Sequence, residues 1–179
     1  AAYWKMHGGR MVFNGGFSGK LPFFIEPDDE VVFAGGRVSV DLNGNESRKG
    51  WYVFSTPSND IPRLRFWYGA NVRTTVDDVF WKGDADVSIR RHESYGIGNF
   101  DLHGTRQRVG TLSGATGCAV YSYDGPARLE LAAPASVTNH ASFRGDVTLR
   151  LDGEGSYSLD AASTSRGAIE VARGTLELL

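Results

Sequence analysis

Large aromatic side chains and polar side chains lie close together in the segment from residue 51 to residue 81. The candidate binding residues in it are Trp51, Trp67, Tyr68, Trp81, Arg63, Arg65 and Asp78. A flat indole or phenol offers a stacking surface to the apolar C–H face of a sugar ring and has little conformational entropy to lose. Arginine and carboxylate groups form strong, directional hydrogen bonds that could orient the sugar hydroxyls. The segment therefore predicts a surface that binds a polysaccharide.

Three pairs of neighbouring aromatic residues decide how much of this surface can be exposed: Trp51 with Tyr52, Trp67 with Tyr68, and Phe80 with Trp81. Successive side chains of a β-strand point to opposite faces. We therefore expect one member of each pair to point into the core. The alternative is that all these rings fill the interior or cap one end of the fold, because large aromatic side chains are highly buried on average.

Further polar residues accompany the aromatic ones along the chain: Asn71, Arg73, Asp77, Asp84 and Asp86. Two short aspartate groups, Asp77-Asp78 and Asp84-Ala85-Asp86, are typical of turns. Carboxylate oxygens are also the ligands that Ca²⁺ prefers, so a structural calcium is the alternative for these groups. No other cofactor is expected.

A catalytic alternative uses the same aspartates, with Arg90 or Arg91 as the basic partner. Glycoside hydrolysis requires two carboxylates at a defined separation across a groove, which a sequence does not reveal. His7, His92, His103 and His140 do not form an HExxH motif or another zinc-binding spacing. Nucleophile-elbow and phosphate-loop motifs are also absent in a suitable context. We therefore expect no catalytic residues, and a β-helical lyase or hydrolase is kept as the second alternative.

Composition narrows the class of protein further. The 179 residues fit one domain, and the net charge of −2 comes from scattered basic and acidic residues. Such a distribution lacks the basic patch of a nucleic-acid-binding protein. No apolar run approaches the length of a membrane span. Cys118, between Gly117 and Ala119, is expected to be a small core residue.

The C-terminal third reads as short strands joined by tight corners. The predicted strands are Val147–Leu151, Ser156–Leu159 and Ala168–Leu178, the last broken by Gly174. Within each strand apolar and polar residues alternate, as expected for one buried and one exposed face. A Leu-x-Leu pair recurs at 129/131, 149/151 and 176/178, and repeats of roughly 20 to 30 residues indicate stacked turns of a solenoid.

The ends of such a coil need covering, because the last turn exposes apolar side chains and unpaired backbone groups. We expect the aromatic residues near the N-terminus to supply an N-terminal cap. The sequence begins without Met or a charged leader and stops within a strand pattern. We therefore expect residues 1–179 to be a single β-helix domain excised from a larger extracellular protein.

The motifs of residues 99–179 resemble a known repeat. They are NFDLHGTRQRVGTLSG (Asn99–Gly114), Leu129-Glu-Leu131 and the final GDVTLRL…GSYSL…AIEVARGTLEL segment. Together they are similar to the autotransporter-associated β-strand repeat, and residues 34–45 look like a weaker copy. The resemblance implies a right-handed parallel β-helix in a secreted or surface-exposed bacterial protein. It also implies the first alternative function, a structural or adhesin passenger segment.

In overall character, size and aromatic content, the whole chain resembles the β-helical, non-catalytic carbohydrate-binding modules that accompany gut-bacterial xylanases. This resemblance implies binding of xylan or a related plant cell-wall polysaccharide. It also implies a linked catalytic domain in the parent chain and an extracellular or cell-surface location.

Overall fold

The chain is a β-solenoid of about seven turns in the computed structural model, which gives a structure for twelve segments. These are residues 4–5, 9–15, 17–21, 23–24, 30–43, 50–57, 60–67, 69–80, 82–93, 96–132, 136–159 and 162–179. For residues 4, 5, 19–21, 23, 24, 39–41, 43 and 67 only the backbone is described. Every regular element in these segments is a strand. Accordingly, no helix of the length and hydropathy needed to cross a membrane occurs in them.

Two parallel sheets form the long walls of the coil. The front sheet contains β2 (Arg10–Phe13), β5 (Glu30–Phe33), β7 (Trp51–Phe54), β9 (Asn71–Thr74), β13 (Asn99–Asp101), β16 (Ala119–Leu131) and β18 (Ser142–Leu159), joined by β14 (Arg106–Val109), β17 (Val137–Asn139), β19 (Thr164–Ser165) and β20 (Ile169–Leu178). The back sheet contains β3 (Phe17–Leu21), β6 (Arg37–Asn43), β8 (Asp60–Trp67), β10 (Asp86–Ile89) and β15 (Thr111–Gly114).

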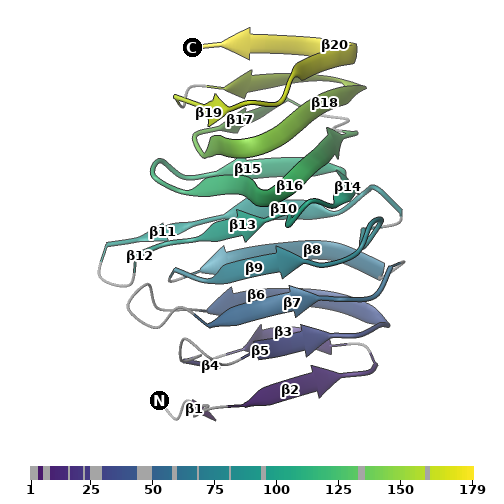
Figure 1. Ribbon diagram of the computed structural model, residues 1–179, viewed down its shortest axis with the longest axis vertical. Helices are drawn as coiled ribbons and strands as arrows, with labels where there is room; N and C mark the ends of the chain where they lie inside the picture. The colour runs from purple at the N-terminus through teal and green to yellow at the C-terminus, as the bar shows by residue number, and fades with distance from the viewer. Residues whose placement is uncertain are drawn as a thin grey trace.

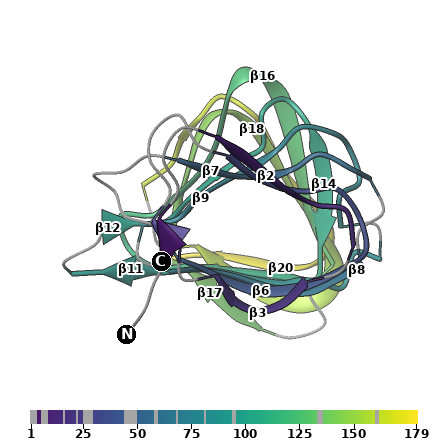
Figure 2. The same ribbon diagram turned by 90° about the horizontal axis from the view of Figure 1, so that it is seen from below.

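Two small strand pairs lie outside these walls. β1 (Trp4–Lys5) pairs in parallel with β4 (Phe23–Phe24) near the N-terminus. β11 (Arg91–His92) and β12 (Gly96–Ile97) form an antiparallel pair. Figures 1 and 2 show this pair projecting to one side of the coil.

The coil is right-handed, as the resemblance to the β-strand repeat implied. In Figure 1 the front strands β2, β7 and β9 run from left to right, whereas β6 and β8 of the back sheet run from right to left behind them. The chain rises from the N-terminus at the bottom to the C-terminus at the top. Figure 2 shows the two walls facing each other across the interior. A chain that turns in this sense while it rises is a right-handed coil.

Side chains at matching positions stack from turn to turn in the interior. Neighbouring strands are about 4.8 Å apart, so identical positions on successive turns come into contact. Phe13, Phe33 and Phe54 are register partners on β2, β5 and β7. Their ring centroids are 5.7 and 4.8 Å apart, and Phe80 follows at 6.2 Å from Phe54. This stack is part of a continuous apolar core that runs through the coil.

Cys118 lies in that core, as expected, and is fully buried. Burial raises the pKa of its thiol above the usual value. The thiol therefore stays protonated and acts as a small packing group.

The predicted corner at residues 152–155 does not interrupt the strand. The expected strands Val147–Leu151 and Ser156–Leu159 both belong to β18, which bends and keeps its pairing with β20 through register shifts. Gly145 lies earlier in β18 with a φ of +72°, and a Cβ there would collide with the Ser122 carbonyl of the turn below. Only glycine fits this bend, because both the backbone conformation and the close approach exclude a side chain.

Aromatic side chains lie at the N-terminal end of the coil, where a cap was expected. The rings of Phe13 and Phe17 lie 5.1 Å apart and pack against the end of the core, which gives this end an aromatic cluster. The remaining N-terminal aromatic side chains, Tyr3 and Trp4, are outside the described side chains.

Candidate functional site

Of the four aromatic residues predicted to bind a ligand, Trp51 is the one whose side chain is among the described residues. It begins β7 and is half-buried on the outer face of the front sheet, whereas Tyr52 is 1% exposed and points into the core. This pair therefore divides between the two faces as strand geometry requires. Tyr68 and Trp81 lie outside the described residues, and the same applies to the side chain of Trp67.

The other predicted binding residues lie elsewhere on the coil. Arg63 and Arg65 belong to β8 in the back sheet, where they alternate with the buried Leu64 and Phe66. Their outer face is on the opposite wall from Trp51 (Figure 2). Sequence proximity between residues 51 and 81 thus does not produce one common surface.

Asp78 occupies the turn after β9. Its φ is +54°, and its carboxylate accepts a hydrogen bond from Arg106 Nη2 at 3.3 Å. The neighbouring Asp77 accepts the backbone N–H of Arg106 at 2.8 Å. Asp86 in turn accepts the Thr111 hydroxyl at 2.8 Å. These contacts are those of turn and inter-turn hydrogen bonding.

A shallow cavity of about 360 Å³ opens on the outer face of the front sheet, and we call it the front cavity. It is lined by Trp51, Asn71, Asn99, Ala119, Tyr121, Tyr123 and Arg144. Strand register explains the gathering: Trp51 pairs with Asn71, Asn71 with Asn99, and Asn99 with Ala119. These residues are 20 to 28 positions apart in the chain but occupy one outer column of consecutive turns.

A second outer column runs beside the first. Arg73 pairs with Asp101, Asp101 with Tyr121, and Tyr121 with Arg144. The Arg73 guanidinium lies over the Trp51 ring, 4.0 Å from its centre, and Arg73 Nε donates to Asp101 Oδ2 at 2.8 Å. A cation over an indole face is an attractive contact. Because Arg73 covers one face of Trp51, a ligand can stack only on the other face.

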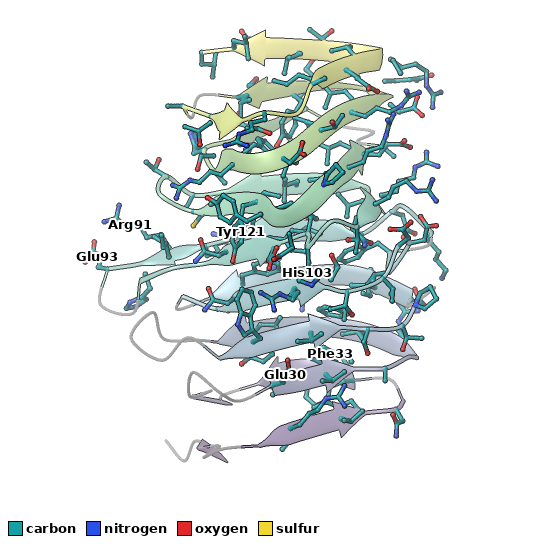
Figure 3. All side chains as sticks on the ribbon, in the orientation of Figure 1. Glu30, Phe33, Arg91, Glu93, His103 and Tyr121 are labelled. Atoms are coloured by element: carbon teal, nitrogen blue, oxygen red, sulfur yellow. The ribbon has the colours of Figure 1, made fainter. Side chains whose placement is uncertain are left out.

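Asp101 is 1% exposed, and its charge is balanced within the site. Besides the Arg73 contact, its Oδ1 accepts the backbone N–H of His103 at 2.9 Å, which holds His103 at a φ of +47°. His103 Nδ1 lies 2.8 Å from Asp124 Oδ2. Figure 3 shows His103 and Tyr121 on the front face of the coil.

Asp101, His103 and Asp124 each bring one possible metal ligand atom within 4.8 Å of the others, the only such group of three within the described residues. The guanidinium of Arg73 already occupies the cationic position beside Asp101. We therefore interpret these side chains as a hydrogen-bond network. The aspartates predicted for calcium are not part of this group.

Two tyrosines complete the stacking surface. Tyr121 and Tyr123 lie on the same face of β16 with ring centroids 5.2 Å apart, and Tyr123 is 69% exposed. Burial, and secondarily the charge of Asp101, raises the pKa of the Tyr121 phenol above its usual value. The hydroxyl therefore remains a neutral hydrogen-bond donor. Sequence reasoning missed both residues, although the alternation Val120-Tyr121-Ser122-Tyr123 places both rings on one face.

Amide and guanidinium groups supply the polar lining. Asn99 Nδ2 donates to Asn71 Oδ1 at 3.1 Å, so the two amides hold each other in place across adjacent turns. Arg144 Nε donates to Ser142 Oγ at 2.9 Å. Asn71 and Arg73 were among the polar residues that the sequence indicated, whereas Asn99 and Arg144 were not.

Chemically, the front cavity combines three aromatic rings with amide, phenol and guanidinium donors. Its described lining contains no Asp or Glu. The arrangement is suited to stacking and hydrogen bonding.

Comparison of the chain with protein-family models, with curated proteins and with solved structures found no match. The fold is therefore defined by the strand pairing itself. The class of ligand is argued from the side chains of the front cavity.

Proposed function

We propose that the chain is a non-catalytic carbohydrate-binding module that binds a plant cell-wall polysaccharide, xylan in the first instance, in the front cavity. The observation that carries the proposal is the gathering of Trp51, Tyr121 and Tyr123 around one open cavity together with amide donors and acceptors. A sugar ring offers an apolar C–H face, which stacks on aromatic side chains, and hydroxyl groups, which hydrogen-bond to polar side chains.

The length of the cavity suits an extended chain. Trp51 on β7 and Tyr121 on β16 are separated by three steps between adjacent strands, which corresponds to roughly 14 Å along the coil axis. A ligand of that length would cover several sugar rings. The Asn71–Asn99 amide pair lies between the two aromatic ends and is placed to contact hydroxyl groups.

In this function the module performs no bond cleavage. It would hold a linked catalytic domain of an extracellular parent protein close to its substrate, and such tethering raises the effective concentration of one partner near the other. The linked domain and the extracellular location are parts of the proposal.

A second candidate is a structural or adhesin segment. The observation that favours it is the column of alternating charges Arg108, Glu130, Arg150 and Glu170 on successive turns, whose ion pairs hold neighbouring turns together. Such a column requires no ligand. It does not account for the aromatic lining of the front cavity.

Affinity electrophoresis in gels that contain soluble xylan, mixed-linkage β-glucan or pectin tests the proposal. We expect retardation of the wild type by xylan and loss of it in Trp51→Ala and Tyr123→Ala. Tyr123 is highly exposed, so its removal costs little packing. Leu178→Ala is the matched control, because Leu178 is 70% exposed on the last turn, away from the cavity.

Unretarded migration of the wild type in every gel would overturn the proposal and favour the structural segment. Release of reducing or unsaturated ends from the polysaccharide would indicate an enzyme. Thermal unfolding of each variant shows whether lost binding reflects a lost fold.

A further inference from the structure

The front cavity carries a local positive charge. Of the described residues that line it, Arg144 alone has a charged side chain. The nearby Arg73 is neutralised by Asp101 at 2.8 Å, and Asp101 is thereby neutralised as well. Within the described lining, the charge that faces a ligand is therefore that of Arg144. The exposed carboxylate of Asp124 lies beside this lining and contacts His103 Nδ1 at 2.8 Å.

Arg144 is held in place by one contact. Its Nε donates to Ser142 Oγ, and Ser142 is nearly buried with its hydroxyl also within 3.4 Å of the Cys118 carbonyl. In the described part of the chain no carboxylate lies within ion-pair distance of Arg144, and its terminal amino groups make no hydrogen bond. By contrast, Arg106, Arg128 and Arg173 each form an ion pair with an Asp or Glu.

A guanidinium with both terminal amino groups available is complementary to a carboxylate. Its two parallel N–H groups match the two carboxylate oxygens, whereas a sugar hydroxyl can occupy only part of that fork. Because Nε is already fixed by Ser142, less conformational entropy is lost when the ligand binds.

The neighbours of Arg144 place a sugar ring beside it. Tyr121 is its register partner on the adjacent strand, and Tyr123 packs against Tyr121 at 5.2 Å. Neighbouring strands are about 4.8 Å apart. A ring that stacks on these tyrosines therefore has its substituents within reach of the guanidinium.

We infer that the front cavity selects glycans that bear a carboxylate, with the uronic acid carboxylate bound by the terminal amino groups of Arg144. This inference rests on the proposed function and specifies its ligand. Neutral stretches of the same polysaccharide contact the aromatic and amide groups, and the carboxylate adds the ionic contact.

Titration calorimetry with a matched pair of polymers tests the inference. The pair is a glucuronoxylan and the same polymer after chemical reduction of its carboxylates to alcohols. We expect the wild type to bind the acidic polymer at least tenfold more tightly at low salt, and the preference to shrink as salt screens the charge.

The variant Arg144→Gln should lose this preference and bind the acidic and the reduced polymer with equal affinity, because the ionic contact that distinguishes them is removed. Arg144→Lys keeps the charge but not the fork, so we expect it to retain only part of the preference. Arg37→Gln is the control, since Arg37 is 68% exposed on the back sheet. Thermal unfolding checks that each variant is folded.

The outcomes separate the inference from the function on which it rests. Equal binding of both polymers by the wild type would overturn the carboxylate preference and leave the carbohydrate-binding function in place. A preference that persists in Arg144→Gln would also overturn it, because the carboxylate would then bind elsewhere. Failure of the wild type to bind either polymer would overturn both.

Discussion

Two outer surfaces of the coil, the front cavity and the charge ladder, are both built by in-register stacking of strands. They differ in whether their side chains pair with one another. We call the column of Arg108, Glu130, Arg150 and Glu170 the charge ladder. Arg108 Nε lies 3.0 Å from Glu130 Oε1, and Arg150 Nη1 lies 3.5 Å from Glu170 Oε2. In-register stacking brings matching positions close together, and like charges directly opposite are destabilising. In the charge ladder, basic and acidic residues alternate from turn to turn, so that each charge lies opposite one of the other sign.

The side chains of the charge ladder neutralise one another mainly through ion pairs. Arg150 Nε lies 3.6 Å from Glu130 Oε2, within ion-pair distance, but it is buried without a hydrogen-bond partner among the described residues. Arg128 adds a contact of 2.8 Å to Glu170. The ladder therefore joins the turns and leaves little binding capacity for a ligand.

The front cavity differs because its groups satisfy one another only in part. The Asn71–Asn99 and Arg73–Asp101 pairs are internal. The ring of Tyr123 is exposed, and the terminal amino groups of Arg144 make no hydrogen bond within the described residues. The comparison indicates that unused stacking and hydrogen-bonding capacity, more than charge or aromatic content, distinguishes the proposed binding surface from the charge ladder.

Reversal of charge within the ladder should have the largest effect on stability. Glu130→Lys places a third cation between Arg108 and Arg150, and Glu130 is only 21% exposed. We expect the free energy of unfolding to fall by about 2 kcal/mol, while polysaccharide binding is unchanged. Urea denaturation measures the first quantity and calorimetry the second. Glu154→Lys, at an exposed position of β18, is the control. Unchanged unfolding in Glu130→Lys would show that the ladder does not stabilise the coil.

Removal of a single hydroxyl from the front cavity should weaken polysaccharide binding and leave stability almost unchanged, which is the converse of the effect in the charge ladder. Tyr121→Phe keeps the ring and loses the donor, so we expect binding to weaken by about fivefold, or roughly 1 kcal/mol, with little change in stability. Calorimetry with the preferred polymer measures this loss. An unchanged affinity would mean that the Tyr121 hydroxyl does not contact the ligand. Tyr157→Phe, in the interior, should leave binding as in the wild type.

A substitution at Tyr157, in the interior, should change the free energy of unfolding and leave binding unchanged, in contrast to Tyr121→Phe on the surface. Its hydroxyl is buried and has no hydrogen-bond partner among the described residues, and burial raises the pKa of the phenol. Because an unsatisfied buried hydroxyl is costly, Tyr157→Phe should raise the free energy of unfolding by about 1 kcal/mol.

The alkaline behaviour of the same variant has a definite sign. The unfolded tyrosine ionises near a pKa of about 10, below the raised folded pKa. Ionisation of Tyr157 therefore leaves the stability of the wild type unchanged below the unfolded pKa and lowers it as pH rises from the unfolded pKa through the folded pKa. The difference in the free energy of unfolding between the wild type and Tyr157→Phe should therefore grow as pH rises above the unfolded pKa of about 10. Parallel curves would contradict ionisation-linked destabilisation at Tyr157.

The smallest effect is expected at an exposed ion pair near the last turn. Arg173 Nε donates to Asp152 Oδ1 at 2.8 Å and holds the pKa of that carboxyl below its usual value. The stabilisation is present above the unfolded pKa of Asp and is lost as pH falls through the folded pKa. In Arg173→Gln the Asp152 pKa should return upward, as a carboxyl NMR titration can measure. Arg166→Gln is the control, and an unshifted Asp152 in Arg173→Gln would contradict the assignment.

Sequence patterns correctly predicted those structural features that depend only on residues adjacent in the chain. Alternation in Trp51-Tyr52 predicted one outer and one inner ring, and glycine-rich corners between short strands predicted a solenoid. The merged strand β18 was not predicted, because a bulge that keeps inter-turn pairing resembles a corner in sequence.

The candidate site could be predicted only for Trp51 and its polar neighbours Asn71 and Arg73. Arg63 and Arg65 lie near Trp51 in the chain, but half a turn of the coil carries them to the opposite wall. Asn99, Tyr121 and Arg144 lie far away in the chain, and register brings them to the front cavity.

The sequence alone therefore determined the strand type, the alternation of faces and the coiling of the chain, because these follow from local periodicity and turn residues. Only the tertiary structure decided which outer residues meet. The spacing between register partners changes from 20 at Trp51–Asn71 to 28 at Asn71–Asn99, since the connections between turns differ in length. Neighbours on the surface of a solenoid lie one turn apart, and the length of each turn is set by how its loops pack.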